Sequence, residues 1–435
     1  MHALDFSKKV DTLKLFLLLC GSFIFQMVSA PSLLFVFFIA FVFLFVFIGS
    51  FNFFASYKIA FYLYLFFFIS VLFLSSFYSH DVWRSLTRSF LSAAFFLLIF
   101  NVADFYSKRL SSGIDLNFLN GLIAGFLVVL LILGLALDGY TGGSGGFRLT
   151  GGVNANTVGF LGFVVVIWSH LSKIYLQSNK NIANFLLFLA VVVVIWSGSR
   201  TVLAALVFFY LVIISLHAFS FFLRMSISKN GLKYTFLAFF IILSSLILFL
   251  NLDYLSSYHG WFAYLESRLN YDPSSDSNLG TRHQAWSILL EYFHANPFFG
   301  GAGWFNATNI LTYHVETYGL EIASSPHNGY VRVLSEVGLL GALAVYSFPL
   351  FFVFYSFFKF VKLSIRKDIA AAPYPIIIAG ILAVFLREYA EDSYLTSYYT
   401  LSTFIVVFLS VFSIHISKRV FGVYPSSHRV KQRRR

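Results

Sequence analysis

Apolar runs long enough to cross a lipid bilayer recur along almost the whole chain. A helix needs roughly 20 apolar residues to cross the hydrocarbon. Charged residues make up only 11% of the chain, against about a quarter in an ordinary soluble domain. We therefore predict an all-α, polytopic membrane protein with about 12 transmembrane helices. The predicted spans are 13–30, 32–50, 59–77, 87–105, 118–137, 157–172, 182–198, 202–223, 235–252, 338–358, 370–387 and 396–416.

Basic residues divide unequally between the two sides that these spans define. With both termini placed in the cytoplasm, 22 of the 30 Lys and Arg residues fall on the cytoplasmic side. Lysine and arginine collect on that side of membrane proteins, which indicates this orientation. The same rule explains the net charge of +12 and the basic end of the chain, so we expect membrane lipids and no nucleic acid as partners. The other side receives eight arginines and no lysine: Arg84, Arg88, Arg148, Arg200, Arg268, Arg282, Arg332 and Arg387.

The longest stretch outside the spans is 253–337, between the predicted ninth and tenth helices. It carries three tryptophans, so we expect it to fold into a partly helical cap on the periplasmic side rather than a loose loop. Within it, 281–297 has the apolar spacing of one helix face. The predicted organisation is 1–252 for helices 1–9, 253–337 for the cap with the active-site residues, 338–416 for helices 10–12, and 417–435 for a basic cytoplasmic tail.

Two of the outer arginines lie where an anion site is plausible from local sequence. Arginine binds phosphate or carboxylate with a two-pronged geometry that lysine lacks. Arg200 follows Gly198 in a tight turn between two spans; the alternative is that its side chain reaches from the bilayer edge to water. Arg282 follows Thr281, a residue suited to cap a helix, and a cation in a first helical turn is explained if an anion binds there. The alternative for Arg282 is an ion pair with Asp272 or Asp276.

His327 is a candidate base in the sequence SPHNGY (325–330). Histidine exchanges a proton near neutral pH. Pro326 restrains the chain before it, and Gly329 allows close approach of backbone or ligand. By residue type alone, a structural histidine is the alternative, and four others share the loop: His259, His283, His294 and His314.

Other polar patterns predict little chemistry. The single cysteine, Cys20, lies in an apolar run, and no HxH or HExxH occurs, so we expect no metal site. The glycine-rich stretch 138–146 lacks the lysine of a phosphate loop. Asn154 or Asn156 is predicted to cap the sixth span. Arg387 and Glu391 have the spacing of an ion pair on a helix.

The sequence around His327 resembles the signature of the O-antigen ligase family. That signature is a histidine followed by Asn, Ser or Gln, then nine residues and GxxG; here it is His327-Asn328, nine residues, and Gly338 to Gly341. The predicted long periplasmic loop between the ninth and tenth spans, GSRT (198–201) and GTRHQAW (280–286) also resemble this family. The resemblance covers about 120–400 and is sharpest over 281–341. The same superfamily includes O-antigen polymerases and some protein O-oligosaccharyltransferases.

The resemblance implies a function for these residues. It implies a bacterial inner-membrane glycosyltransferase that takes a glycan from undecaprenyl diphosphate and works without metal or other cofactor, with inversion. His327 would be the general base, and Arg200 and Arg282 would bind the diphosphate. Gly338 and Gly341 would let a neighbouring helix approach closely. Asn328 would either orient the histidine or close the turn.

The sequence is compatible with two different acceptor substrates. A ligase transfers to lipid A–core, and the complete histidine signature favours it. A polymerase transfers to a second lipid-linked repeat unit. It is favoured because 253–337 has three arginines against eight acidic residues, whereas lipid A–core carries many phosphates. A transporter of lipid-linked glycans would place charges deep in several spans, and such residues are scarce in this sequence.

Overall fold

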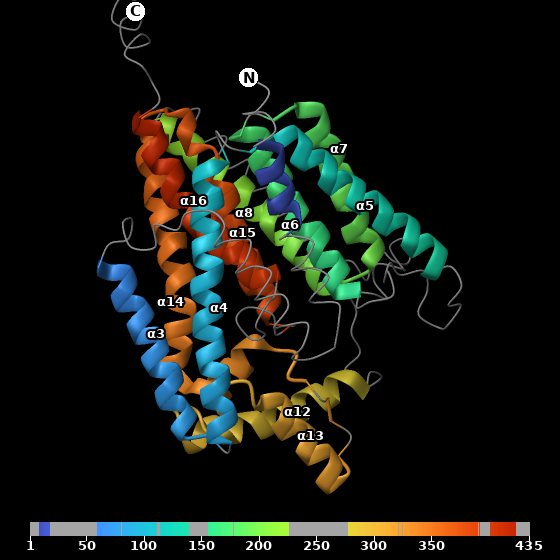
Figure 1. Cartoon of the computed structure of the whole chain (residues 1–435), viewed down its shortest axis with the longest axis vertical. Coiled ribbons are helices and arrows are strands. Elements are labelled where there is room, and N and C mark those ends of the chain that lie inside the picture. Colours follow the sequence, from blue (N-terminus) through green and yellow to red (C-terminus); the bar gives the residue numbers. More distant parts are fainter. Residues whose placement is uncertain are drawn as a thin grey trace, which may run out of the picture.

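A computed structural model describes residues 8–17, 59–79, 81–110, 114–138, 155–176, 178–225, 277–320, 322–323, 325–389, 391 and 401–422. Every regular element in these ranges is a helix, as predicted, and Figure 1 shows their arrangement. Besides a helix at 8–17, the elements are α3 (Ile59–Phe77), α4 (Val82–Arg109), α5 (Leu116–Asp138), α6 (Ala155–Ile174), α7 (Lys180–Ser197), α8 (Arg200–Met225), α12 (Ser277–Ala295), α13 (Ala307–Tyr318), α14 (Gly329–Ile365), the 3-10 helix η1 (Ile369–Ala371), α15 (Tyr374–Glu388) and α16 (Leu401–Gly422).

Most of these helices are membrane spans by length and composition. Seven of the described stretches are long and apolar enough to cross a bilayer: α4, α5, α6, α7, α8, α14 and the segment Ile369–Glu388 that ends in α15. The shorter apolar helices Leu63–Phe77 and Leu401–Ile416 belong to α3 and α16. The predicted spans 13–30, 32–50 and 235–252 lie wholly or largely outside the described residues. The protein is thus a membrane protein, and its described part contains seven helices able to cross a bilayer. The count of twelve spans stays a prediction.

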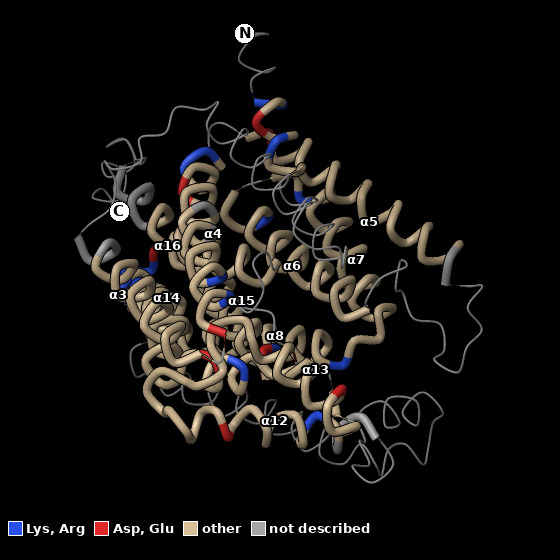
Figure 2. The backbone as a smooth tube through the Cα atoms, turned by 60° about the horizontal axis from the view of Figure 1, so that its bottom comes forward, with Lys and Arg blue, Asp and Glu red and all other residues tan. Residues whose placement is uncertain are grey.

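The connections predicted to be cytoplasmic meet at one end of the helix bundle. The start of α5 lies beside the turn before α7, because the backbone N–H of Asn179 donates to Asn117 Oδ1 at 2.9 Å. The ends of α8 and α14 meet where Ser220 Oγ donates to Ser364 Oγ at 2.9 Å. Figure 2 shows long uncharged stretches of helix with many of the charged residues near helix ends. These contacts agree with the predicted placement of each pair of connections on one side, and the orientation of the bundle stays a prediction.

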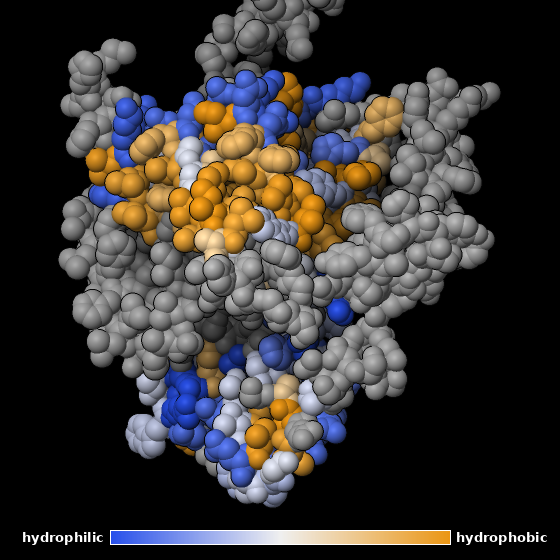
Figure 3. Space-filling model, turned by 90° about the vertical axis from the view of Figure 1, so that its right-hand side faces the viewer, coloured by the Kyte–Doolittle hydropathy of each residue, from blue (hydrophilic) through white to orange (hydrophobic). Residues whose placement is uncertain are grey.

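Apolar side chains cover the outside of the bundle as well as its interior. Figure 3 shows a hydrophobic zone under a polar rim on one face, with a more polar part below. The exposed apolar residues of α5 and α7 include Val129, Ile132, Leu135, Phe185 and Phe188. In a lipid bilayer these side chains face a solvent as apolar as themselves, so their exposure is expected of a membrane protein.

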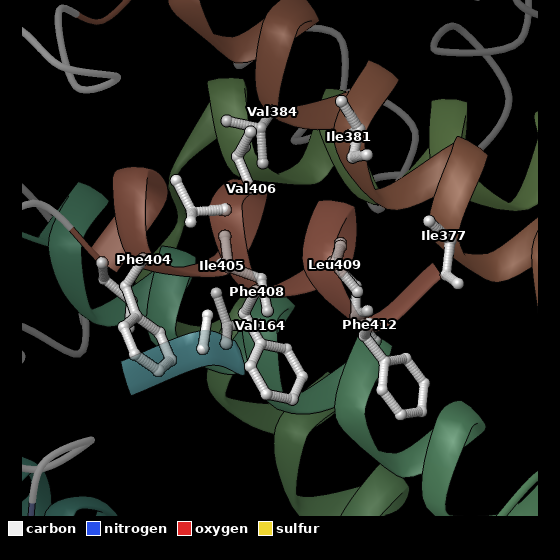
Figure 4. Close-up of a cluster of buried hydrophobic side chains, with 14 of the residues drawn as sticks. Val164, Ile377, Ile381, Val384, Phe404, Ile405, Val406, Phe408, Leu409 and Phe412 are labelled. Atoms are coloured by element: carbon white, nitrogen blue, oxygen red, sulfur yellow. The ribbon is translucent and has the colours of Figure 1, made fainter. Parts of the chain in front are cut away.

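Close packing of α6, α15 and α16 forms the centre of the bundle. Figure 4 shows one apolar cluster formed by Val164 of α6, by Ile377, Ile381 and Val384 of α15, and by Phe404, Ile405, Val406, Phe408, Leu409 and Phe412 of α16. Glycines permit the closest approaches: a Cβ on Gly162 would lie 2.9 Å from the carbonyl oxygen of Ala190 in α7. Small residues at such positions let helices in lipid gain van der Waals contact.

Two helices of the predicted cap, α12 and α13, lie across the end of α3, α4 and α14 (Figure 1). They share a small apolar core made by Ala285, Leu289, Ala302, Ile310 and Leu311. Ser79, after α3, donates from Oγ to the carbonyl of Ala302 at 3.2 Å, which joins this layer to the spans. The described part of the cap is thus partly helical, as predicted. Residues 253–276 lie outside the described residues, and the sidedness of the cap stays a prediction.

Candidate active site

His327 lies in a short turn immediately before α14. Its φ is 48°, a left-handed conformation that side chains other than glycine rarely adopt. Asn328 ends the turn as the N-cap of α14: its Oδ1 accepts from the N–H groups of Tyr330 at 3.0 Å and Val331 at 3.1 Å. Of the two roles considered for Asn328, the structure shows the one that closes the turn. Strained backbone beside a firm cap holds His327 in one place.

Contacts from α12 and α15 hold the same turn from both sides. Trp286 of α12 donates from Nε1 to the carbonyl oxygen of Pro326 at 2.6 Å. On the other side, a Cβ on Gly329 would lie 2.2 Å from Oε2 of the buried Glu388. A side chain at 329 would therefore displace that carboxylate. This close approach gives the glycine of HNGY its structural reason.

The imidazole of His327 has one buried nitrogen and an accessible remainder. Nδ1 is buried, has no hydrogen-bond partner among the described residues, and lies 4.0 Å from Oε2 of Glu391. The side chain as a whole is 36% exposed, so the accessible part of the ring includes Nε2. The other oxygen of Glu391 accepts a hydrogen bond from the amide of Asn156, at the start of α6. An accessible ring nitrogen backed by a carboxylate is suited to take a proton from a substrate.

Arg282 lies on α12, one helical turn before Trp286. We predicted Thr281 as an N-cap, and this is wrong because α12 already begins at Ser277. Gly280 lies inside the helix, where a glycine costs about 1 kcal/mol and is tolerated. An anion bound at the helix N-terminus therefore does not explain Arg282. The carbonyl of Thr281 accepts from the N–H of Ala323 at 3.3 Å, which brings this part of α12 against the chain leading to His327.

Arg200 is the first residue of α8 and is exposed. Gly198 ends α7 in the left-handed conformation, so the tight turn predicted from the sequence is confirmed. The turn packs on α6, since a Cβ on Gly159 would meet Ser197 Oγ at 2.4 Å. One turn earlier in α6, Asn156 contacts Glu391, the neighbour of His327. Arg200 and His327 therefore lie at the same end of the bundle, and no direct contact joins them.

Two classes of arginine are present at this end. Neither Arg200 nor Arg282 forms a hydrogen bond or an ion pair to any residue the structure describes, and the proposed partners Asp272 and Asp276 lie outside those residues. Three other arginines are engaged. Arg332 pairs with the buried Glu336 at 3.1 Å, Arg88 donates to the carbonyl of Phe305, and Arg387 lies 4.3 Å over the ring of Phe160. The two arginines singled out by the resemblance are thus uncommitted within the described part of the chain.

Gly338 breaks α14 into two helices. Its φ of 65° and ψ of −163° lie in a region that is essentially restricted to glycine. At the break, the N–H groups of Leu339 and Leu340 donate to the carbonyls of Pro297 and Phe298 at 2.8 and 3.1 Å. A Cβ on Gly338 would lie 2.5 Å from the carbonyl carbon of Phe298. The loop after α12 is therefore inserted into the kink.

The GxxG segment does not act as predicted. The backbone that approaches Gly338 belongs to the loop after α12 and not to a neighbouring helix. At Gly341, a Cβ would meet the side chain of Val337 at 2.1 Å, so this glycine gives room inside the kinked segment itself. Together they fix the direction of the short helix that starts at Asn328, and so support the His327 turn indirectly.

Three residues near His327 were missed as functional candidates. Asn156 was expected only as a helix cap, but α6 begins at Ala155 and the amide of Asn156 contacts Glu391. Glu391 was expected to pair with Arg387 at helical spacing. The backbone bond from Glu391 N to Arg387 O at 3.0 Å confirms that spacing, while the carboxylate contacts given above show what else the side chain does. Trp286 was read only as part of an apolar helix face.

The remaining sequence candidates are placed as follows. His283 packs on the Trp286 ring with centroids 4.8 Å apart, and His294 and His314 lie elsewhere on α12 and α13. His259 and nearly all of the glycine-rich stretch 138–146 lie outside the described residues. The described residues contain no group of three or more His, Cys, Asp or Glu side chains able to hold a metal ion. Metal-independent chemistry stays a prediction.

A comparison with protein families adds an independent observation to this geometry. The model of a family described as O-antigen ligase matches residues 185–346. The matched segment contains Arg200, Arg282 and His327 together with both glycines of the kink. A search of curated proteins gives no match. Residues 185–346 are therefore similar to the O-antigen ligase family, and this match supports assignment to that class of glycosyltransferase-like membrane enzymes.

Proposed function

We propose that the protein is an O-antigen ligase of the bacterial inner membrane. It transfers a glycan from undecaprenyl diphosphate to a sugar hydroxyl of lipid A–core, on the periplasmic side, with both termini in the cytoplasm. The observation that carries this proposal is that the family match includes Arg200, Arg282 and His327, and that His327 presents an accessible ring from a firmly held turn.

His327 is the general base of the proposed reaction. Its accessible Nε2 takes the proton of the acceptor hydroxyl while that oxygen attacks the anomeric carbon of the donor sugar. The bond from this carbon to the phosphate oxygen breaks, and undecaprenyl diphosphate leaves with the bonding electrons. Attack opposite the leaving group inverts the anomeric configuration. The proton on the imidazole then passes to solvent, which restores the base.

Arg200 and Arg282 stabilise the leaving diphosphate. Charge accumulates on the phosphate oxygens as the glycosidic bond breaks, and guanidinium groups that hold those oxygens lower the barrier. Both side chains are uncommitted within the described residues, which supports this role, and both lie at the end of the bundle that carries His327. The diphosphate would then sit near the membrane surface with its polyprenyl chain in the lipid.

Polymerisation is the alternative, and one structural observation favours it. Of the three arginines in 253–337, Arg332 is buried and paired with Glu336, so it is not available to a phosphorylated acceptor. This leaves a surface poor in positive charge for lipid A–core. A second lipid-linked repeat unit carries fewer phosphates than lipid A–core and would need less positive charge on this surface. Protein-directed transfer is a further variant of the same chemistry with a different acceptor.

The family match argues against transport as the main function. Among the residues that the structure describes, the buried Asp, Glu and Arg side chains also lie close to helix ends: Arg332 and Glu336 are near the start of α14, Arg387 and Glu388 end α15, and Asp104 lies near the end of α4. A path for a charged substrate would instead need such residues along the middle of several spans.

Deletion of the gene separates the candidates. Lipopolysaccharide that lacks all O-chain, with long chains accumulating on the lipid carrier, supports the ligase. Core that carries a single repeat unit supports the polymerase. Unchanged lipopolysaccharide on a gel contradicts both. Complementation with the wild-type gene is the control.

A further inference from the structure

The carboxylate of Glu391 lies where it can set the orientation and charge of the His327 ring. Its Oε2 is 4.0 Å from Nδ1, and Nδ1 has no other hydrogen-bond partner among the described residues. Movement of about 1 Å would bring the pair to an ordinary charge-assisted hydrogen bond. Such bonds are often long in a substrate-free site and shorten when the substrate binds.

Glu391 is itself held in place. Asn156 of α6 donates from its amide to Oε1, and the backbone N–H of Glu391 continues the helical bonding of α15 through Arg387 O at 3.0 Å. Its side chain is 12% exposed, so water screens it only in part. The carboxylate therefore has one oxygen fixed by a neighbouring helix and one oxygen directed to the histidine.

We propose that Glu391, fixed by Asn156, is the positioning residue for His327. The inference rests on the proposed function and extends it. When the acceptor hydroxyl gives its proton to Nε2, the imidazolium that forms carries its second N–H at Nδ1, and this N–H donates to Glu391. The carboxylate keeps its negative charge throughout and orients the ring so that Nε2 faces the substrate. A carboxylate, a histidine and a hydroxyl act together in this manner in serine hydrolases.

Other charged groups near His327 do not provide the same contact. Glu388 lies against Gly329 on the far side of the turn. His283 packs on Trp286 of α12, and Arg282 is one turn away on the same helix. Only Glu391 has a carboxylate oxygen recorded within 4.0 Å of a nitrogen of this ring in the described part of the chain.

Chemical modification of His327 tests the contact without substrate. Diethyl pyrocarbonate reacts with the neutral imidazole, and mass spectrometry of the full-length protein in lipid nanodiscs gives the rate at each histidine. Glu391→Gln removes the charge of the side chain and keeps its size, whereas Glu391→Asp keeps the charge. In Glu391→Gln we expect the rate of His327 modification to change about fivefold, the factor for a weak charge–charge contact. In Glu391→Asp we expect the rate to stay closer to that of the wild-type protein.

Two results would overturn the inference. An unchanged rate in Glu391→Gln would mean that Glu391 has no electrostatic influence on His327. A change in Glu391→Asp as large as that in Glu391→Gln would mean that Glu391 acts on the ring only by packing. His283 in the same sample reports general changes in accessibility, and Glu316→Gln, an exposed carboxylate on α13, is the matched control.

Transfer activity provides the second readout. Glu391→Gln is expected to lower kcat at least tenfold, and Asn156→Ala, which keeps the carboxylate but removes its anchor, to lower it less. If His327→Ala is inactive but Glu391→Gln has wild-type kcat and modification rates, the inference fails and the proposed function stands. If His327→Ala transfers normally, the proposed base is wrong whatever Glu391 does.

Discussion

The described part of the bundle contains two histidine–carboxylate pairs that differ in distance and in exposure. At one end, His415 Nε2 lies 2.7 Å from Asp104 Oδ1, and both side chains are almost buried, at 10% and 12% exposed. At the other end, His327 Nδ1 lies 4.0 Å from Glu391 Oε2, and the histidine is 36% exposed. Asp104 is about 24 Å along α4 from Arg88, which contacts the loop near the cap.

This difference separates a structural pair from a pair suited to catalysis. Asp104 also pairs with Lys108, so its carboxylate joins α4 to α16 and has little freedom. His327 has a strained backbone, one nitrogen without a described partner and an accessible ring. The first arrangement contributes stability. In the proposed function, the second gives up stability for access to a substrate.

The largest expected effect comes from breaking the buried pair. Asp104→Ala leaves His415 and Lys108 without their carboxylate and should lower the free energy of unfolding by roughly 3–5 kcal/mol. His327→Ala removes a partly exposed side chain and should change it by less than about 1 kcal/mol. Thermal unfolding in detergent compares the two variants. Equal losses would show that the distinction between the pairs is false.

Substitution at the kink in α14 should also lower the free energy of unfolding. The kink supports the His327–Glu391 pair through backbone contacts. Gly338→Ala places a Cβ 2.5 Å from the carbonyl carbon of Phe298 and strains a glycine-specific conformation. We expect a loss of roughly 2–4 kcal/mol. Gly125→Ala in α5 is the matched control, since its Cβ would meet nothing within 4 Å. A wild-type unfolding temperature for Gly338→Ala would contradict the described kink.

Substitution of Arg200 or Arg282, at the end of the bundle that carries His327, is expected to have a smaller effect. It should lower activity and leave stability unchanged. Arg282→Lys and Arg200→Lys keep the charge and lose the two-pronged geometry, so each should lower transfer roughly tenfold. Arg84→Lys, on exposed α4 surface at the same end, should leave activity unchanged. Transfer by membranes supplied with lipid-linked glycan and lipid A–core measures this. Full activity of both lysine variants would mean that neither arginine grips a diphosphate.

The smallest effect should follow from loosening the His327 turn. Trp286→Phe removes the hydrogen bond to Pro326 O and keeps most of the ring packing. Loss of one such bond costs about 0.5–1.5 kcal/mol. We expect a few-fold lower kcat at unchanged protein level, read from the same transfer assay. An effect as large as that of His327→Ala would assign Trp286 a direct role.

Much of the fold could be predicted from the sequence because lipid imposes simple rules. Nine of the twelve predicted spans coincide with described helices, and the helix in 281–297 is present as α12. The start of α12 was misplaced because Thr281 was taken as its N-cap, whereas the helix begins at Ser277. The kink at Gly338 was missed, since only the inserted loop 297–300 shows why this GxxG needs a positive φ.

Only part of the candidate site could be predicted from the sequence. His327, Arg200 and Arg282 were singled out from their local sequence and then from the resemblance to a family. Glu391 and Asn156 are separated by 235 positions, and nothing local indicates that they meet. The spacing of Arg387 and Glu391 suggested an ion pair within one helix, and a contact to another helix cannot be read from such a pattern.

The most direct test uses purified protein in nanodiscs with an undecaprenyl-diphosphate-linked glycan and lipid A–core. We predict that His327→Ala lowers the initial rate of transfer by about 10²–10⁴-fold, the contribution of a general base, while His415→Ala keeps wild-type turnover per folded molecule. Near-normal transfer by His327→Ala would contradict the assignment of the base and the account built on it.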